Sequence, residues 1–274
     1  MTLSGRDISE LLAAHGLHPS RALGQNFVVD PNTVRRVARL AEVGPGDRVV
    51  EIGAGLGSLT LALVETGADV TAIEVDRGLV PVLRSVVEPH GVRVVEADAL
   101  TADWQDILGD DPWALVANLP YNVATPLVAN LLDGVPQINR MLVMVQREVG
   151  ERLAAKAGDD AYGAISVKVG YWARAEVVGR VPPTVFFPKP KVESALVRIV
   201  RRETPAVATD VDPAWLFSVV RAGFAHRRKM LRGALQGVAT AEQIEAAGIA
   251  PTARAEEIDI EAWGRLAREA AARE

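Results

Sequence analysis

Short apolar and β-branched runs alternate with segments of helical length along much of the chain. We expect strands at residues 48–52, 70–75, 93–96, 115–118 and 141–146, and two later ones at 165–171 and 195–201. Most of these runs are mainly apolar, which is typical of strands covered on both faces, and the helical segments between them favour parallel pairing. The pattern therefore predicts an α/β domain with a parallel sheet and helices on both faces.

Two helices are expected before the first strand. One covers residues 7–15. The second has Asp30 as its N-cap, Pro31 at its first position and apolar side chains spaced for one face.

The strand pattern ends after Arg202. The segment ETPAVATDVDP is typical of a linker, and the rest of the chain has helical patterns only. We therefore expect two domains: residues 1–203 form the α/β domain with its N-terminal helices, and residues 204–274 form a small all-helical domain.

Composition narrows the classes of protein. The chain is 49% hydrophobic and 24% charged, a globular mix, and no stretch approaches the roughly 18 apolar residues of a membrane span. The absence of cysteine excludes disulfides, a thiolate nucleophile and sulfur-ligated zinc. The four histidines lack ligand spacing, so no metal is expected. We expect a cytoplasmic protein.

A glycine-rich turn, Gly53-Ala54-Gly55-Leu56-Gly57, follows the first strand directly. Glycines there let the backbone approach a ligand, and ligands of open parallel sheets bind at the carboxyl ends of the strands. Glu74, Asp98 and Asn118 end later strands or follow them closely, so they share this rim. Glu74 can accept both hydroxyls of a ribose. The combination predicts a site for an adenosine derivative.

The spacing of the glycines leaves a second ligand class open. Gly-x-Gly-x-Gly differs from the dinucleotide fingerprint Gly-x-Gly-x-x-Gly, so a nicotinamide or flavin oxidoreductase is the alternative. No phosphate-loop motif occurs in the sequence, which excludes that class of NTPase.

The loop Asn118-Leu119-Pro120-Tyr121 suits chemistry on an adenine amino group. That nitrogen is a poor nucleophile because its lone pair is delocalised into the ring. The Asn118 amide oxygen and a carbonyl of the Leu119-Pro120 turn can accept its two hydrogens and free the lone pair. Pro120 stiffens the turn and Tyr121 offers a stacking surface. This is catalysis by positioning and electrostatics, without a strong general base.

Aromatic side chains in Gly- and Pro-rich loops are candidates for gripping an extruded base. We expect Tyr121 and Phe186 to form the two faces of that clamp and Phe187 to be packed in the protein. The net charge is −5, yet eleven Lys and Arg face four Asp and Glu between residues 180 and 235. Phosphate contacts are therefore expected at Lys189, Lys191, Arg221, Arg227, Arg228, Lys229 and Arg232.

The ordered motifs resemble those of the ribosomal RNA adenine dimethyltransferases, most of all the bacterial small-subunit (16S) branch. They are LGQNF at 23–27, EIGAGLGSLT at 51–60, IEVD at 73–76, EADAL at 96–100, NLPYNVATPL at 118–127 and VPPTVFFPKPKVESALV at 181–197. The resemblance implies a Rossmann-like methyltransferase sheet, S-adenosylmethionine as cofactor, and 16S rRNA of the small ribosomal subunit or its precursor as partner. It further implies two methyl groups on N6 of each of two neighbouring adenines in a hairpin loop near the 3′ end, as a step of ribosome biogenesis.

The resemblance also implies roles for individual residues. Asp98 holds the cofactor's adenine amino group and Asn118 faces the target nitrogen. Ala54 replaces a frequent proline and Ala124 a frequent serine of the family, and neither position carries the expected chemistry. The cofactor-binding residues expected in all are Gln25, Asn26, Val28, Gly53, Gly55, Glu74, Val75, Asp98, Ala99 and Asn118.

Three alternatives remain beside this interpretation. One is the related large-subunit methyltransferase of macrolide resistance, against which NLPYNVATPL and the helical tail argue. Another is a ribosome-assembly factor that only binds, against which the intact Asn118–Tyr121 loop argues. The third is the oxidoreductase. We expect a monomer.

Overall fold

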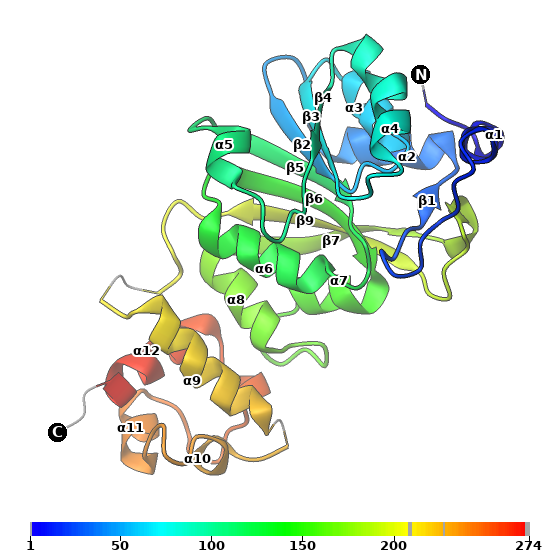
Figure 1. Cartoon of the computed structure of the whole chain (residues 1–274). Helices are drawn as coiled ribbons and strands as arrows, with labels where there is room; N and C mark the ends of the chain where they lie inside the picture. The colour runs from blue at the N-terminus through cyan, green and yellow to red at the C-terminus, as the bar shows by residue number, and fades with distance from the viewer. Residues whose placement is uncertain (1, 208–209, 227, 272–274) are drawn as a thin grey trace. The chain divides into compact units, whose positions relative to one another are not determined.

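The computed structural model describes residues 2–207, 210–226 and 228–271 (Figure 1). Its contacts group the chain into two compact units: Met1–Gly150 with Glu176–Val200, and Glu151–Ala175 with Arg201–Glu274. This grouping differs from the expected division at residue 203, because residues 151–175 belong with the C-terminal residues. The chain passes from one unit to the other more than once, which a boundary drawn in chain order does not capture.

A sheet with seven strands among the described residues forms the centre of the first unit, in the order β4-β3-β2-β5-β6-β9-β7. Strands β2 to β6 pair in parallel and β9 is antiparallel to β6. The chain order reverses between β2 and β5, and ligands bind at the carboxyl ends beside such a reversal. The strands are β2 (Arg48–Ile52), β3 (Asp69–Glu74), β4 (Arg93–Glu96), β5 (Trp113–Asn118), β6 (Ile138–Gln146), β7 (Ala173–Val181) and β9 (Ser194–Arg201).

The five expected parallel strands and the expected strand at 195–201 are confirmed, with ends that shift by up to three residues. A further pair, β1 (Phe27–Val28) and β8 (Phe186–Phe187), forms a separate antiparallel sheet. The predicted fold class, an α/β domain with helices on both faces and a helical C-terminal region, is confirmed.

Helices cover both faces of the large sheet. Figure 1 shows α6 against the face opposite to α2 and α3. The expected cap of α2 is confirmed, since Asp30 accepts a hydrogen bond of 2.9 Å from the Thr33 backbone N–H. The helices of this part of the chain are α1 (Gly5–Ala14), α2 (Pro31–Leu40), α3 (Ser58–Val64), α4 (Val80–Val87), α5 (Trp104–Leu108), α6 (Ala124–Gly134) and α7 (Arg147–Ala154), with 3₁₀ turns η1 (Glu88–His90) and η2 (Pro183–Val185).

The second unit is helical. Trp263 and Leu216 are fully buried in its core. Its helices are α8 (Ala164–Trp172), α9 (Pro213–Ala225), α10 (Leu231–Ala234), α11 (Ala241–Ala246) and α12 (Ile260–Ala271), with a 3₁₀ turn η3 (Ala255–Glu257).

The expected strand at 165–171 is wrong, because this segment is helix α8. The stretch Val-Lys-Val-Gly-Tyr alternates as a strand would, but the helix buries Val167 and Tyr171 among the helices of the second unit. Ser166 also fixes the helix start, since its Oγ accepts a 3.0 Å hydrogen bond from the Gly163 N–H. Alternation of apolar and polar residues over only five positions does not distinguish a strand from a helix.

Two features are absent from the described residues. None of their helices is both long and apolar enough to cross a membrane. No group of three His, Asp or Glu side chains among them is arranged to hold a metal ion.

Candidate active site

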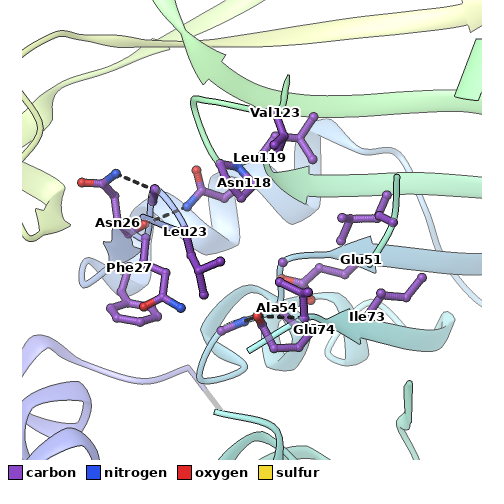
Figure 2. Close-up of a pocket in the computed structure, with 18 of the residues that line it drawn as sticks. Leu23, Asn26, Phe27, Glu51, Ala54, Ile73, Glu74, Asn118, Leu119 and Val123 are labelled. Atoms are coloured by element: carbon purple, nitrogen blue, oxygen red, sulfur yellow. Dashed lines mark hydrogen bonds between the residues drawn. The ribbon is translucent and has the colours of Figure 1, made fainter. Parts of the chain in front are cut away.

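A pocket opens in the first unit at the carboxyl ends of β2, β3 and β5 (Figure 2). All ten expected cofactor-binding residues line it, and so do Leu119, Pro120 and Tyr121. Residues 23–28 form part of its wall, although they precede the sheet by twenty residues or more in sequence. The structure thus brings together residues of five motifs that are separated in sequence, while the role of each residue remains a prediction.

Charge is distributed unevenly in this pocket. Glu51, Glu74 and Asp98 line it, whereas no Lys, Arg or His is among its described lining residues. A pocket with the carboxyl groups of Glu74 and Asp98 and no cation among its described lining residues favours a positively charged ligand and disfavours a pyrophosphate. This distribution argues against the dinucleotide-dependent oxidoreductase.

The glycine turn has the left-handed backbone that the sequence suggests. Gly53, Gly55 and Gly57 have φ of +72°, +60° and +88°, which side-chain-bearing residues rarely adopt. A Cβ on Gly55 would lie 2.9 Å from Phe27 Cε1. The turn therefore needs glycine both for its conformation and for its contact with the Phe27 ring.

Glu74 fixes the glycine turn through its carboxylate. Its Oε2 accepts the Gly55 N–H at 2.8 Å, and its Oε1 accepts the N–H groups of Val75 and Asp76 at 3.0 and 2.9 Å. A carboxylate offers about four acceptor positions, so one position on Oε2 remains. Glu74 can thus accept one ribose hydroxyl in this arrangement, rather than the two that we expected. Burial raises the pKa of Glu74, although the three N–H groups favour its ionised form.

A second buried acid, Glu51, was missed by the sequence analysis. It is 2% exposed and its Oε2 accepts a hydrogen bond of 2.5 Å from the Thr60 hydroxyl. Burial raises the pKa of Glu51 to about 8, and the charge of Glu74 adds to the rise. A carboxylate inside an apolar strand, two residues before the first glycine, is the signal that could have found it.

Asn118 is held by its amide nitrogen. Its Nδ2 donates a 2.9 Å hydrogen bond to the Asn26 carbonyl, as Figure 2 shows. Its Oδ1 has no hydrogen-bond partner among the described residues, and neither has the Leu119 carbonyl. Both predicted acceptors of the loop therefore lack a partner among the described residues, and both belong to residues that line the pocket.

The Asn-Leu-Pro-Tyr loop is tied to β9 by a hydrogen bond between two hydroxyls. Tyr121 Oη and Ser194 Oγ lie 2.8 Å apart, Ser194 is fully buried and Tyr121 is half-buried. Burial raises the pKa of Tyr121 and the Ser194 hydroxyl opposes that rise. Ser194 was also missed, although a serine directly before the apolar stretch 195–197 is a visible signal.

The segment 20–26 is fixed against the pocket by its polar side chains. Gln25 Nε2 donates to Asp76 Oδ2 at 2.7 Å, and Gln25 Oε1 accepts the Ser20 N–H at 2.7 Å. Asn26 Nδ2 donates to the Gly24 carbonyl at 3.0 Å. Gln25 and Asn26 therefore hold this wall of the pocket in place, and this use of their side chains was not expected.

Two expected contacts for the adenosine part of a cofactor lie at the pocket edge. Asp98 is exposed and accepts a 2.9 Å hydrogen bond from the Leu100 N–H through Oδ1. Val75 is 45% exposed, which gives the pocket an apolar surface suited to a purine ring.

The expected clamp is corrected by the structure. Phe186 is 4% exposed and lies in the core with Val28 and Val34, whereas Phe187 is 45% exposed. Strand β8 has only two residues, and neighbouring side chains of a strand point to opposite faces. The burial of the two rings is therefore the reverse of the expectation, and Phe186 is not available beside Tyr121.

The expected RNA-binding residues belong to both units. Lys189 and Lys191 are exposed between β8 and β9 of the first unit. Arg221, Arg228, Lys229 and Arg232 are exposed on the second unit, in and between α9 and α10, and Arg227 lies outside the described residues. Their contact with RNA remains a prediction.

Comparison with known proteins identifies the family. The family model "Ribosomal RNA adenine dimethylase" matches residues 18–272. "Ribosomal RNA small subunit methyltransferase A" of Cutibacterium acnes is 51% identical over 92% of this chain and 88% of its own length; that of Streptomyces coelicolor is 47% identical over 97% and 96%. The crystal structure of the 23S rRNA methyltransferase ErmE has a TM-score of 0.69 at 28% identity, covering 89% of this chain and 98% of that one. A Plasmodium falciparum dimethyladenosine transferase shares the fold, with a TM-score of 0.71 at 21% identity over 86% and 94%. By its sequence and by the arrangement of its motifs around one pocket, the chain belongs to the ribosomal RNA adenine dimethylase family.

Proposed function

We propose that the chain transfers methyl groups from S-adenosylmethionine to N6 of two adjacent adenines, in a hairpin loop near the 3′ end of the 16S rRNA of the small ribosomal subunit. The observation that carries the proposal is an acidic pocket, without Lys, Arg or His among its described lining residues, that includes the Asn118–Tyr121 loop, whose two acceptors have no partner among the described residues. The relatives that are 45–51% identical carry the small-subunit name, which favours that subunit over the large one.

The residues of the pocket suit S-adenosylmethionine. The Oε2 of Glu74 keeps one acceptor position for a ribose hydroxyl, Asp98 is exposed for an adenine amino group, and Val75 offers an apolar surface to the ring. The buried Oγ of Ser58, which belongs to a lining residue, has no hydrogen-bond partner among the described residues. When bound, this cofactor supplies a methyl group on a positively charged sulfur, and the carboxyl groups of Glu74 and Asp98 favour that charge.

The catalytic contribution of the chain is to hold the target amino group. Asn118 Oδ1 and the Leu119 carbonyl accept its two hydrogens, so the lone pair of N6 is no longer conjugated with the ring. Tyr121 provides a surface for the base, and Ser194 fixes the direction of its hydroxyl. None of these groups needs to remove a proton before the methyl group is transferred, because the proton passes to water afterwards.

The exposed basic residues support binding to the RNA backbone. The residues that support it are exposed and positively charged, so they can neutralise phosphates: Lys189 and Lys191 of the first unit, and Arg221, Arg228, Lys229 and Arg232 of the second. Local basic residues on an otherwise acidic chain restrict where the polyanion can bind.

Labelled S-adenosylmethionine and unmethylated ribosomal subunits test the proposal. We expect N6,N6-dimethyladenosine at two neighbouring positions of 16S rRNA in small subunits, and no label in large subunits. Label in 23S rRNA would instead support the large-subunit enzyme. An Asn118→Ala variant that still binds small subunits would separate methylation from a role in assembly. No transfer to either subunit by the unaltered chain would overturn the proposal.

A further inference from the structure

One aromatic ring of the first unit is exposed beside the pocket. Phe187 is 45% exposed, and it is the only aromatic among the large exposed hydrophobic side chains of the described residues. A single exposed apolar side chain is common on protein surfaces, so the exposure alone does not indicate a ligand and the surroundings of the ring decide. Neither the proposed cofactor contacts nor the Asn118–Tyr121 loop uses this ring.

Strand pairing places Phe187 next to the wall of the pocket. In the β1–β8 pair Phe187 lies directly opposite Phe27, and Val28 lies opposite Phe186. Side chains of directly opposed residues share one face, with Cβ atoms about 5 Å apart. Phe27 lines the pocket and contacts Gly55 of the glycine turn. The exposed ring is therefore one side chain away from the predicted donor site.

The backbone that carries Phe187 is anchored on both sides. Before it, the Val185 carbonyl accepts the Val29 N–H at 2.8 Å. After it, the Glu193 carbonyl accepts the Arg147 N–H at 2.9 Å, and Ser194 bonds Tyr121. Because both ends are held, the ring has a defined place relative to Tyr121, and stacking on it would cost little ordering of the chain.

The charge around Phe187 suits a polyanion. Lys189 and Lys191 are exposed and make no ion pair with any described residue. The one acid of this segment, Glu193, lies 3.5 Å from the Arg147 guanidinium, so its charge is balanced. An exposed aromatic with two lysines beside it is a combination that binds single-stranded RNA by stacking and phosphate contact.

We propose that Phe187, Lys189 and Lys191 form a second nucleotide subsite, in which an unpaired base next to the target adenine stacks on Phe187 and the lysines contact the adjoining phosphates. The inference rests on the proposed function and deepens it. Two adjacent adenines need a place for one while the other is in the pocket, and this subsite provides it. Exchange of the two bases then lets one pocket modify both.

A fluorescent RNA tests the subsite. The probe is a synthetic hairpin whose loop has two adjacent adenines, with 2-aminopurine replacing one of them, and it is titrated with the full chain without donor. We expect stacking to quench the fluorescence. Phe187→Leu should abolish most of the quenching and weaken binding about tenfold, because base–aromatic stacking has that order of strength. Phe187→Tyr should retain the quenching and the affinity. Val177 is another exposed apolar side chain of the first unit, and Val177→Ala should behave as the unaltered chain.

The lysines are tested by salt. Lys189→Ala and Lys191→Ala should each reduce the slope of log Kd against log salt by roughly 0.7, the value for one phosphate contact on a single strand. Equal quenching and affinity in Phe187→Leu and the unaltered chain would overturn the subsite, as would absence of quenching by the unaltered chain.

Methylation of small subunits by the same preparations separates the two proposals. If the unaltered chain methylates them and Phe187→Leu is indistinguishable in quenching, affinity and methylation, only the subsite fails. If the unaltered chain transfers no methyl group, the proposed function fails, and the subsite fails with it.

Discussion

Glu51 makes the stability of the protein depend on pH. Its pKa is about 8 in the folded chain, well above its ordinary value of 4.5. Between these values the folded chain retains a proton that the unfolded chain releases, so stability falls as pH rises. Glu51→Gln removes this term and keeps an acceptor for Thr60. When the pH is raised from 5.5 to 7.5, the difference in free energy of unfolding between Glu51→Gln and the unaltered chain should change by about 2 kcal/mol in favour of the variant.

Urea unfolding at the two pH values measures this difference. Thr60→Ser is the matched control, because it keeps the hydroxyl and leaves the carboxyl in place. A Glu51→Gln variant whose stability follows the unaltered chain at both pH values would show that Glu51 is ionised in the folded state.

Asn118 is expected to act mainly on the rate of methyl transfer. Asn118→Ala removes one of the two acceptors for the target amino group, and loss of one such group typically lowers kcat on the order of a hundredfold. Incorporation of labelled methyl groups into small subunits measures kcat. Asn122→Ala is the control, since Asn122 lies in the same loop and its Nδ2 bonds the Ala22 carbonyl at 3.2 Å. Equal loss in both variants would mean that Asn118 only supports the loop.

Single residues differ in how well a sequence reveals them. Gly53, Glu74 and Asn118 were predictable because strand ends and a glycine turn determine where they lie. The faces of Phe186 and Phe187 were not, because β8 has two residues and no alternation long enough to set its phase. Glu51 and Ser194 were not predicted because each forms a local side-chain hydrogen bond, which the sequence pattern of its strand does not reveal.

At the level of elements, the glycine turn has a steric requirement that can be isolated. Gly55→Ala puts a Cβ 2.9 Å from Phe27 Cε1 at φ +60°, whereas at Gly91, with φ +83°, a Cβ meets nothing within 4 Å. Both variants should lose about 1 kcal/mol of stability to the left-handed backbone. Only Gly55→Ala should also weaken donor binding, by tenfold or more, because Phe27 must move.

Thermal unfolding and calorimetric titration with S-adenosylmethionine measure the two effects separately. Donor binding by Gly55→Ala that matches Gly91→Ala would refute the role of the Phe27 contact.

The hydroxyl pair of Tyr121 and Ser194 couples the catalytic loop to β9. Loss of either hydroxyl removes a hydrogen bond with a net strength of about 1 kcal/mol, so Ser194→Ala and Tyr121→Phe should each lower methylation several-fold. The double variant should lose little more than either single one, because the two act through one contact. The methylation rates of the unaltered chain, the two single variants and the double variant form a double-mutant cycle. Additive losses of rate would show that the two side chains act independently.

Strands were predicted correctly where most residues of the segment are apolar, as in β2 and β5. Helix α8 was misread because its residues alternate as a strand does, and only burial among the other helices of its unit decides the outcome. Strand β7 was not anticipated, since its sequence ARAEVVGRV carries charges through most of its length.

For the whole molecule, the grouping of residues 151–175 with the C-terminal residues depends on contacts between distant parts of the chain, which a scan for linkers does not detect. The charge asymmetry, in contrast, is visible in the sequence and leads to a prediction about separable binding. The described residues that line the donor pocket all belong to the first unit, and the described arginines and lysines of the α9–α10 segment belong to the second.

Removal of two positive charges from the second unit should therefore weaken RNA binding without affecting donor binding. Arg228→Ala with Lys229→Ala should reduce affinity for small-subunit RNA several-fold at low salt, with a smaller salt slope, because fewer counterions are released. The dissociation constant for S-adenosylmethionine should stay unchanged. The control is Arg6→Ala with Arg77→Ala, which removes the same charge from two residues of the first unit that are exposed and paired with Glu10 and Glu96. If both double variants weakened RNA binding equally, the net charge of the protein would be responsible and the α9–α10 segment would have no special role. A local contact with RNA predicts instead that the position of the removed charges matters.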